Sequence, residues 1–231
     1  MVIKQRAWDS FRRYSENIFD IIGGTPLVRL NKVGAGMEPD VFVKLEWYSP
    51  TGSLKDRIYL NMLAKAGERG DLKAGMTVLE CSTGNAGIAC SFVAAMMGYP
   101  CIVVMPEGMS DERKKLMRAY GSDLVFTPGG ESDVDLALEK LEKMRADEPD
   151  KYWVPAQFDN LDNNEAHYLT TGPEIWEQLD GKVDAIVASQ GTGGWVSGVG
   201  KYVREQNPDV GLYAVEPEEC PLLSERGWGP H

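Results

Sequence analysis

Short apolar runs alternate with longer amphipathic segments along almost the whole chain. The short runs have the length and period of β-strands and lie at 26–30, 41–47, 76–81, 100–106, 123–128, 151–156, 184–190 and 211–217. The longer segments have helical spacing, and several open with a Ser or Asn cap and close at a Gly; they lie at 55–70, 86–98, 110–121, 131–149, 164–179 and 196–206. This alternation predicts βαβ units and a mainly parallel sheet, hence an α/β fold.

The turns between these segments are where chemistry is expected. In folds of this type, ligands gather at the carboxyl ends of strands, where strand-to-helix turns present free backbone N–H groups. Three such turns carry residues with chemical potential, at 49–57, 80–87 and 190–198. The Gly- and Pro-bearing segment 31–40 is most simply a loop between two strands.

Composition narrows the class of protein. The chain has 231 residues and 43% hydrophobic content, enough for one large domain or two small ones. Its apolar runs are far shorter than the roughly 18 residues of a membrane span, and its first residues lack the apolar core of a signal peptide, so we expect a cytoplasmic protein. The net charge of −11 opposes nucleic-acid binding and favours a small-molecule partner.

The cysteines and histidines exclude two kinds of site. Four cysteines show no C-x-x-C pairing and lie in or beside apolar segments, which indicates reduced and mostly buried thiols. Two histidines, His167 and His231, are too few for a His-rich metal site or a convincing Ser-His-Asp triad. We therefore expect no metal, and for His167 an ordinary structural role.

The first turn, "SPTGSLKDR", places Lys55 where a turn becomes a helix. Thr51 and Ser53 are natural N-cap residues, so Lys55 falls in the first helical turn. The helix dipole disfavours a cation there, and burial would lower the pKa of the ammonium further. A partly neutral lysine is a nucleophile suited to forming an imine, although an ordinary solvated lysine paired with Asp56 or a nearby acid remains the alternative.

The second turn, "ECSTGNAG", follows a predicted strand and precedes a helix. Thr83, Gly84 and Asn85 would put a hydroxyl, an amide and backbone N–H groups at the helix N-terminus, which suits an anion such as a carboxylate. A plain capped turn explains the same residues equally well.

The third turn, "QGTGGWVSG", predicts a phosphate cradle. Gly191, Gly193 and Gly194 follow a continuous apolar strand and let the backbone approach a ligand closely. A dinucleotide fingerprint would need glycine at position 196, which is Val196, although Glu216 ends the following strand. A dinucleotide-binding oxidoreductase therefore stays open as a weaker alternative. A lysine for an imine, an asparagine loop and a phosphate cradle together match the needs of pyridoxal 5′-phosphate (PLP).

Five motifs in this order resemble a known family: "GGTPLVRLN", "PTGSLKDR", "ECSTGNAG", "AQFDN" and "GTGGWVSGVG". From about residue 18 to the end, the chain resembles the fold-type II PLP enzymes of the cysteine synthase (O-acetylserine sulfhydrylase) and cystathionine β-synthase group. The resemblance implies a tryptophan synthase β-like fold of two three-layer αβα domains with mainly parallel sheets. It implies a small mobile N-terminal domain from 1–26 and 49–159, and a larger C-terminal domain from 27–48 and 160–231.

The resemblance also implies roles for named residues. Lys55 would form the Schiff base with PLP and later take the Cα proton of the substrate, and Asn85 would contact the 3′ oxygen of the cofactor ring. The amino-acid carboxylate would be held by Thr83, Gly84, Asn85 and Gln157. The cofactor phosphate would be bound by Gly191, Thr192, Gly193, Gly194 and Trp195.

The reaction implied is a PLP-dependent β-replacement on an O-activated serine such as O-acetylserine, in which sulfide enters and L-cysteine leaves. The protein would be a transferase of cysteine biosynthesis and, like its family, a homodimer. Related β-elimination or cystathionine β-synthase-type activity is the nearest alternative. A non-catalytic, shortened relative that acts as an interaction protein is the alternative from another class.

Three departures from the family pattern stand out. Ala86 replaces a threonine expected to touch the substrate carboxylate, and Trp195 replaces a phosphate-binding threonine, so that its indole is either core packing or a wall of the site. The chain ends at "LSERGWGPH", before the residue that faces the pyridine nitrogen in the family. We expect a truncated form of a longer enzyme, with an open sheet edge and exposed apolar surface in its C-terminal part.

Overall fold

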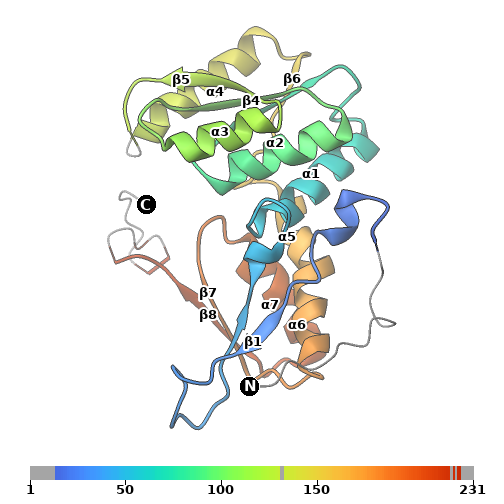
Figure 1. The fold of residues 1–231 in the computed structure, drawn as a ribbon, viewed down its shortest axis with the longest axis vertical. Helices are drawn as coiled ribbons and strands as arrows, with labels where there is room; N and C mark the ends of the chain where they lie inside the picture. The colour runs from blue at the N-terminus through green and yellow to red at the C-terminus, as the bar shows by residue number, and fades with distance from the viewer. Residues whose placement is uncertain (1–13, 131–132, 219–220, 222, 225–231) are drawn as a thin grey trace.

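The computed structural model describes residues 14–130, 133–218, 221 and 223–224 (Figure 1). All eight predicted strands are present: β1 (Leu27–Arg29), β2 (Phe42–Lys44), β3 (Thr77–Cys81), β4 (Cys101–Pro106), β5 (Asp123–Thr127), β6 (Tyr152–Trp153), β7 (Ala185–Ser189) and β8 (Gly211–Val215). The helices are α1 (Lys55–Arg69), α2 (Asn85–Met97), α3 (Asp111–Ala119), α4 (Val134–Asp147), α5 (Leu161–Ala166), α6 (Gly172–Gln178) and α7 (Gly194–Gln206). Cys220, His231 and the predicted helical start at 131–132 lie outside the described residues.

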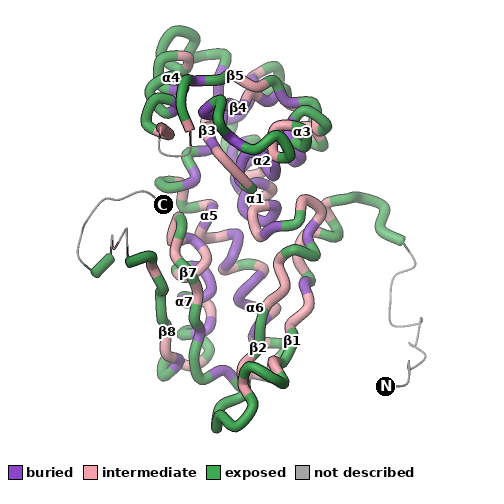
Figure 2. Tube along the Cα trace, turned by 60° about the vertical axis from the view of Figure 1, so that its left-hand side comes forward, coloured by how far each residue is buried: buried purple, intermediate pink, exposed green. Residues whose placement is uncertain are grey.

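The largest sheet forms the middle of a three-layer sandwich. Its order is β5-β4-β3-β6 and every neighbouring pair is parallel, as the sequence predicted. Successive strand residues point to opposite faces: Val78 and Val103 pack with α1 and α2, whereas Leu79 and Val104 pack with α4. Figure 2 shows the buried residues gathered where α1 and α2 meet this sheet. Burial on both faces explains why the strands read as continuous apolar runs.

A second group of elements lies at the other end of the molecule (Figure 1). Strands β7 and β8 pair in parallel, and one face of this pair packs on α6 and α7 through a cluster that includes Ile186, Val199 and Val203. Apolar side chains on these strands remain exposed, among them Val187 at 64% and Tyr213 at 59%. The pair β1–β2 is antiparallel and is the exception to the predicted parallel pairing. The predicted domain boundaries remain a prediction.

The predicted helix 164–179 is interrupted in the structure. Between α5 and α6 lies the π-helical turn η5 (His167–Thr171), in which the Gly172 N–H donates to the His167 carbonyl five residues earlier. Pro173 has no N–H, so it cannot donate the next hydrogen bond of an α-helix. The wider π-helical turn η5 accommodates this missing donor. The helical period of the sequence does not reveal this local change.

Helix α7 packs closely on this interrupted segment, and a glycine permits the contact. A Cβ at Gly198 would lie 2.2 Å from the Asn164 carbonyl oxygen and 2.8 Å from the His167 Cβ. We expect Gly198→Ala to lower the free energy of unfolding by about 1–3 kcal/mol, because backbone atoms cannot yield as a flexible side chain can. Urea unfolding measures this, with Gly130→Ala as the control because a Cβ there meets open space. Equal stability of the two variants would contradict the expectation.

The cysteines behave as the sequence predicted within the described residues. Cys81, Cys90 and Cys101 are free thiols, the last two of them buried. The Cys90 and Cys101 sulfur atoms lie 3.9 Å apart, a contact distance and not a covalent bond. None of the described helices is long and apolar enough to cross a membrane.

Candidate active site

Lys55 is the first residue of α1 and so lies in the first helical turn as predicted, although the cap position is Leu54 and neither Thr51 nor Ser53. The Lys55 N–H donates to the Ser53 hydroxyl at 3.3 Å, so Ser53 helps to satisfy the helix start. Thr51 does not cap the helix. Instead its N–H donates to the Asp56 carboxylate at 2.8 Å, which fixes the turn and occupies the acid that could have paired with Lys55.

The Lys55 ammonium lies in a half-buried position that favours its neutral form. Burial lowers the pKa of Lys55 below its usual value, and the nearby carboxyl of Glu80 opposes this only in part. The Lys55 Nζ donates to Gln157 Oε1 at 3.2 Å. The predicted alternative, a solvated lysine paired with Asp56, does not describe this environment. The side chain has the surroundings of a potential nucleophile or base.

The glycine turn after β7 forms the start of α7. Gly193 has φ of +77°, a left-handed conformation that glycine adopts without strain, and Gly194 is the first residue of the helix. Around Gly191 and Gly193 a Cβ would meet nothing within 4 Å, so the space beside the turn is open. The N-terminal N–H groups of α7 therefore face room for an anion, which their partial positive charge favours.

Lys55 and the glycine turn share one cavity, although more than a hundred residues of sequence separate them. The cavity has a volume of about 250 Å³, and its lining includes Lys55, His167, Gly191, Thr192, Gly193 and Trp195. Gly194 is buried behind the turn. The indole of Trp195 both lines the cavity and packs on the core below α7, so the two sequence interpretations of this residue hold together. The amine of Lys55 and the anion cradle at the start of α7 therefore line the same cavity.

The asparagine loop lies outside this cavity. Asn85 begins α2 and is exposed, and Ser82 holds the turn by accepting from the N–H groups of Gly84 and Gly87. The Arg113 guanidinium donates to the Thr83 carbonyl at 3.0 Å. None of these contacts reaches Lys55, so the predicted roles of Thr83, Gly84 and Asn85 remain predictions.

The carboxyl of Glu80, near the end of β3, is buried and interacts with the charge of Lys55. Glu80 precedes the asparagine loop, and burial raises the pKa of its carboxyl to about 7, although hydrogen bonds from Tyr59 and Cys81 and the Lys55 charge lower it. The Tyr59 hydroxyl donates to Glu80 at 2.7 Å, one helical turn after Lys55. No pattern in the sequence singles out this glutamate, because its burial depends on the packing of α1 against β3.

His167, for which the sequence predicted a structural role, is buried in the wall of the cavity. It is 1% exposed, its Nδ1 lies 2.9 Å from the Thr171 hydroxyl, and its ring lines the cavity beside Lys55. Its Nε2 has no partner among the described residues. Burial, with the charges of Arg57 and Lys55, lowers the pKa of His167 to about 3, so the ring is neutral. It is the first residue of the π-helical turn η5.

Neutral burial of His167 has an effect on stability that depends on pH. The unfolded imidazole takes up a proton near pH 6.5 and the folded one only near pH 3, so its contribution is complete above pH 6.5 and is lost as the pH falls toward 3. We expect the wild type to lose up to about 1.4 kcal/mol per pH unit more than His167→Gln within this window. Urea unfolding from pH 4 to 7 measures both slopes, and parallel slopes would contradict a neutral buried ring.

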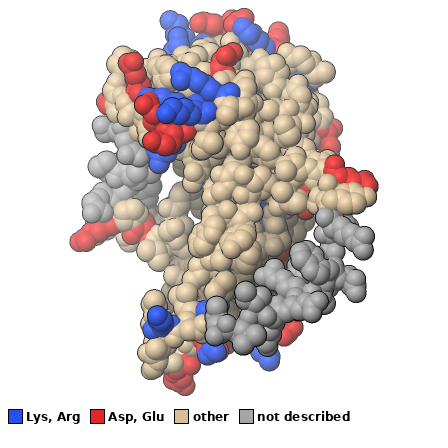
Figure 3. Space-filling view, viewed as in Figure 1, with Lys and Arg blue, Asp and Glu red and all other residues tan. Residues whose placement is uncertain are grey.

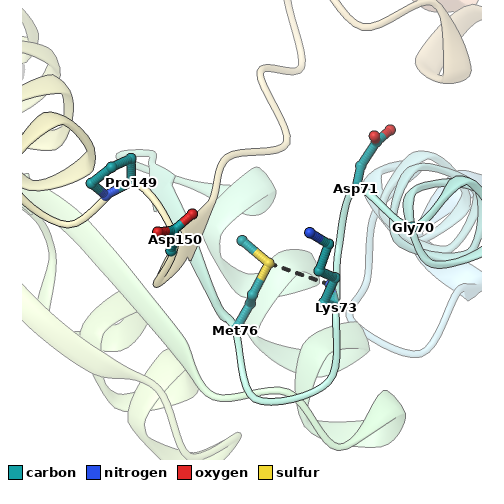
Figure 4. A pocket seen from close by; sticks show the side chains of 6 residues that line it. All are labelled: Gly70, Asp71, Lys73, Met76, Pro149 and Asp150. Carbon is teal, nitrogen blue, oxygen red and sulfur yellow. Dashed lines mark hydrogen bonds between the residues drawn. The ribbon is translucent and has the colours of Figure 1, made fainter.

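A second hollow lies at the amino ends of strands β3 and β6 in the large sheet. It has a volume of about 560 Å³ and is lined by Gly70, Asp71, Lys73, Met76, Pro149 and Asp150 (Figure 4). These residues precede β3 and β6, at the amino ends of the strands, whereas ligands of parallel sheets bind at the carboxyl ends. The described residues contain no group of His, Cys, Asp and Glu side chains able to hold a metal ion. The smaller cavity beside Lys55 is therefore the candidate active site.

Comparison with known proteins identifies relatives over nearly the whole chain. Residues 18–227 match the protein family described as pyridoxal-phosphate dependent enzyme. A cysteine synthase of Staphylococcus aureus is 47% identical over 217 residues, which are 94% of this chain and 69% of the relative.

Two solved structures have the same fold. Cysteine synthase (OASS) from Entamoeba histolytica superposes with a TM-score of 0.92 at 39% identity, over all of this chain and 68% of that one. A hydrogen sulfide-producing enzyme from Fusobacterium nucleatum superposes with a TM-score of 0.89 at 40% identity, over 95% of this chain and 71% of the other.

Proposed function

The chain belongs to the family of pyridoxal-phosphate dependent enzymes, and we propose that within it the protein is a cysteine synthase, which uses O-acetylserine and sulfide to make L-cysteine. The observation that carries the proposal is the single cavity shared by Lys55 and the N-terminus of α7. It supplies an imine-forming amine and an anion cradle in one space. The proposed formation of L-cysteine from O-acetylserine and sulfide is a transferase reaction of amino-acid biosynthesis.

The donor groups of the cavity fit PLP. The cradle at Gly191–Gly194 offers backbone N–H groups and open space to a phosphate, and the Thr192 hydroxyl lies beside it. The half-buried Lys55, whose pKa is lowered by burial, fits the aldehyde end of the cofactor. When bound, PLP supplies an electron sink that stabilises negative charge on the substrate Cα.

Each polar group of the site has a role in this proposal. Lys55 would bind the cofactor covalently through Nζ and take the proton from the substrate Cα, tasks that require a neutral amine. Gln157 accepts a hydrogen bond from Nζ, which supports a role in holding both Lys55 and the substrate carboxylate. The exposed start of α2 at Asn85, with Thr83 and Gly84, would bind that carboxylate from the other side.

Two of the departures from the family pattern, Ala86 and Trp195, bear on substrate choice. Ala86 is buried and offers no hydroxyl, so carboxylate binding would rest on Thr83, Asn85 and backbone N–H groups. The indole of Trp195 narrows the cavity next to the phosphate cradle. We propose O-acetylserine as the substrate because the Staphylococcus aureus relative and the Entamoeba histolytica structure, each similar over most of this chain, are cysteine synthases.

The test combines a spectrum with product analysis. The purified chain is incubated with PLP, and the visible absorption band of lysine-bound cofactor is recorded before and after O-acetylserine and then sulfide are added. A band that shifts with O-acetylserine and returns with sulfide, together with cysteine as product, supports the proposal. Pyruvate as the main product would favour β-elimination instead, and absence of the band would contradict PLP binding by this chain.

We also propose that the protein is a cytoplasmic homodimer. Free thiols at all three described cysteines agree with a reducing compartment. Trp47 and Tyr48 are each 62% exposed, and on the face seen in Figure 3 the charged side chains lie mainly near the two ends, which leaves an uncharged middle for a subunit contact. Light scattering of the purified protein measures the mass, and a monomer at micromolar concentration would contradict the dimer.

A further inference from the structure

Asn163 connects Gln157 to the glycine turn of the site. It lies in α5 and is 2% exposed. Its amide Nδ2 donates to the Gln157 carbonyl oxygen at 2.8 Å and to the Thr192 hydroxyl oxygen at 2.9 Å. Gln157 accepts the Asn163 bond at its backbone carbonyl and the Lys55 bond at its side-chain Oε1, so Asn163 holds the backbone of the residue that contacts the lysine.

The orientation of the Asn163 amide follows from its partners. A backbone carbonyl can only accept, so the NH₂ group has to face Gln157, and the same NH₂ group faces Thr192. The Thr192 oxygen therefore acts as an acceptor, and it also accepts a long bond of 3.4 Å from the Gly194 N–H. The single hydroxyl hydrogen of Thr192 donates to none of the described residues and is available to a ligand in the cavity.

Asn163 also fixes the position of the cradle. A Cβ at Gly194 would lie 2.2 Å from the Asn163 Oδ1, so the start of α7 rests directly on this side chain. Side-chain amides held by two bonds in a buried site lose little further freedom when a ligand arrives, and such preorganisation strengthens binding. The cradle is thus set before the anion enters.

We propose that Asn163 is a positioning residue for the cofactor phosphate: it turns Thr192 into an obligate hydrogen-bond donor toward a phosphate oxygen. The inference rests on the proposed function, since it assumes PLP in the cavity. Asn163 itself does not contact the reacting atoms. Its effect is transmitted through Thr192 and is confined to the phosphate end of the ligand.

The experiment measures dissociation constants of PLP and of pyridoxal, which has the same aldehyde but no phosphate, from the absorption band of the lysine-bound ligand. Four proteins are compared: wild type, Asn163→Ala, Thr192→Ala and the double variant. We expect Asn163→Ala to weaken PLP about tenfold or more, the size of a lost hydrogen bond to a charged group, and to leave pyridoxal binding within about twofold. In the Thr192→Ala background the same change should have almost no further effect.

Two controls separate positioning from general damage. Asn61→Ala removes a side-chain amide that also bonds to α5, through the Asp162 carbonyl and Glu165, away from the cradle, and should leave both ligands unaffected. Urea unfolding of each variant without ligand reports its folding. Equal weakening of PLP and pyridoxal by Asn163→Ala, or the same loss in both Thr192 backgrounds, would overturn the inference.

The outcomes also distinguish this inference from the proposed function. If the wild type binds PLP and Asn163→Ala binds it equally well, the inference alone is wrong. If the wild type does not bind PLP, the proposed function and the inference built on it fail together.

Discussion

Replacing Lys55 with alanine is expected to abolish covalent cofactor binding and to reduce cysteine formation at least about 10³-fold, the upper part of the range for loss of a positioned acid–base group. The reason is that Lys55 is the residue in the cavity whose buried amine can both form an imine and accept the Cα proton. The measurement is the visible spectrum with PLP, followed by an assay of cysteine from O-acetylserine and sulfide.

Two control variants make this test specific. Lys55→Arg keeps a positive charge in the same place but cannot form the imine, so it should lose the absorption band as completely as the alanine variant. Lys65→Ala removes a partly exposed lysine of the same helix, which pairs with Glu165, and should retain the band and the activity. A Lys55→Ala protein that keeps both the band and normal turnover would contradict the assignment of Lys55.

The second large effect concerns Arg57, two residues after Lys55 and 2% exposed. Its guanidinium donates to Glu46 at 2.8 Å and to Glu174 at 2.6 Å, so it ties α1 to the segment after β2 and to α6. Lys44 joins the same cluster, 2.7 Å from Glu174. Two cations and two anions therefore neutralise one another in a cluster that is largely shielded from water. Removing one of them leaves a partner charge buried without its counter-ion.

Replacing Arg57 with methionine is expected to lower the free energy of unfolding by about 3–5 kcal/mol, because two carboxylates would remain buried without their shared partner. That is a large fraction of the about 5–15 kcal/mol that stabilises a typical domain. Urea unfolding gives the value. Arg69→Met is the matched control, since Arg69 belongs to the same helix but is exposed, and its solvated ion pairs should contribute far less to stability.

The same cluster predicts how stability responds to acid. Burial alone would raise the pKa of Glu174, but hydrogen bonds from Arg57 and Lys44 outweigh it and hold the pKa at about 2. The folded pKa lies below the unfolded value of 4.5, so the contribution is complete above pH 4.5 and is lost as the pH falls toward 2. Arg57→Met should flatten this part of the stability profile. An unchanged acid slope together with a loss below 1 kcal/mol would show that the cluster contributes little.

Much of the fold could be predicted because the signals are local. The strands and most helices follow from apolar periodicity, and the placement of Lys55 in the first turn of α1 was predicted although the cap position is Leu54. The three reactive turns follow from the rule that ligands bind at strand ends. A resemblance carried by motifs near Lys55, Asn85 and Gly191 gave the family, which the comparisons confirm.

The sequence alone thus determined the order of elements, the family and the turns worth inspecting, since each depends on residues close together in the chain. The tertiary structure places Lys55 and Thr192 in one cavity, as the family resemblance implied, and it alone decided that Asn163 links Gln157 to the cradle and that His167 is buried and neutral there. It also decided that the carboxylate of Glu174 pairs with Arg57. These facts depend on desolvation and on contacts between residues far apart in the chain, and the local periodicity of the sequence predicts neither of them.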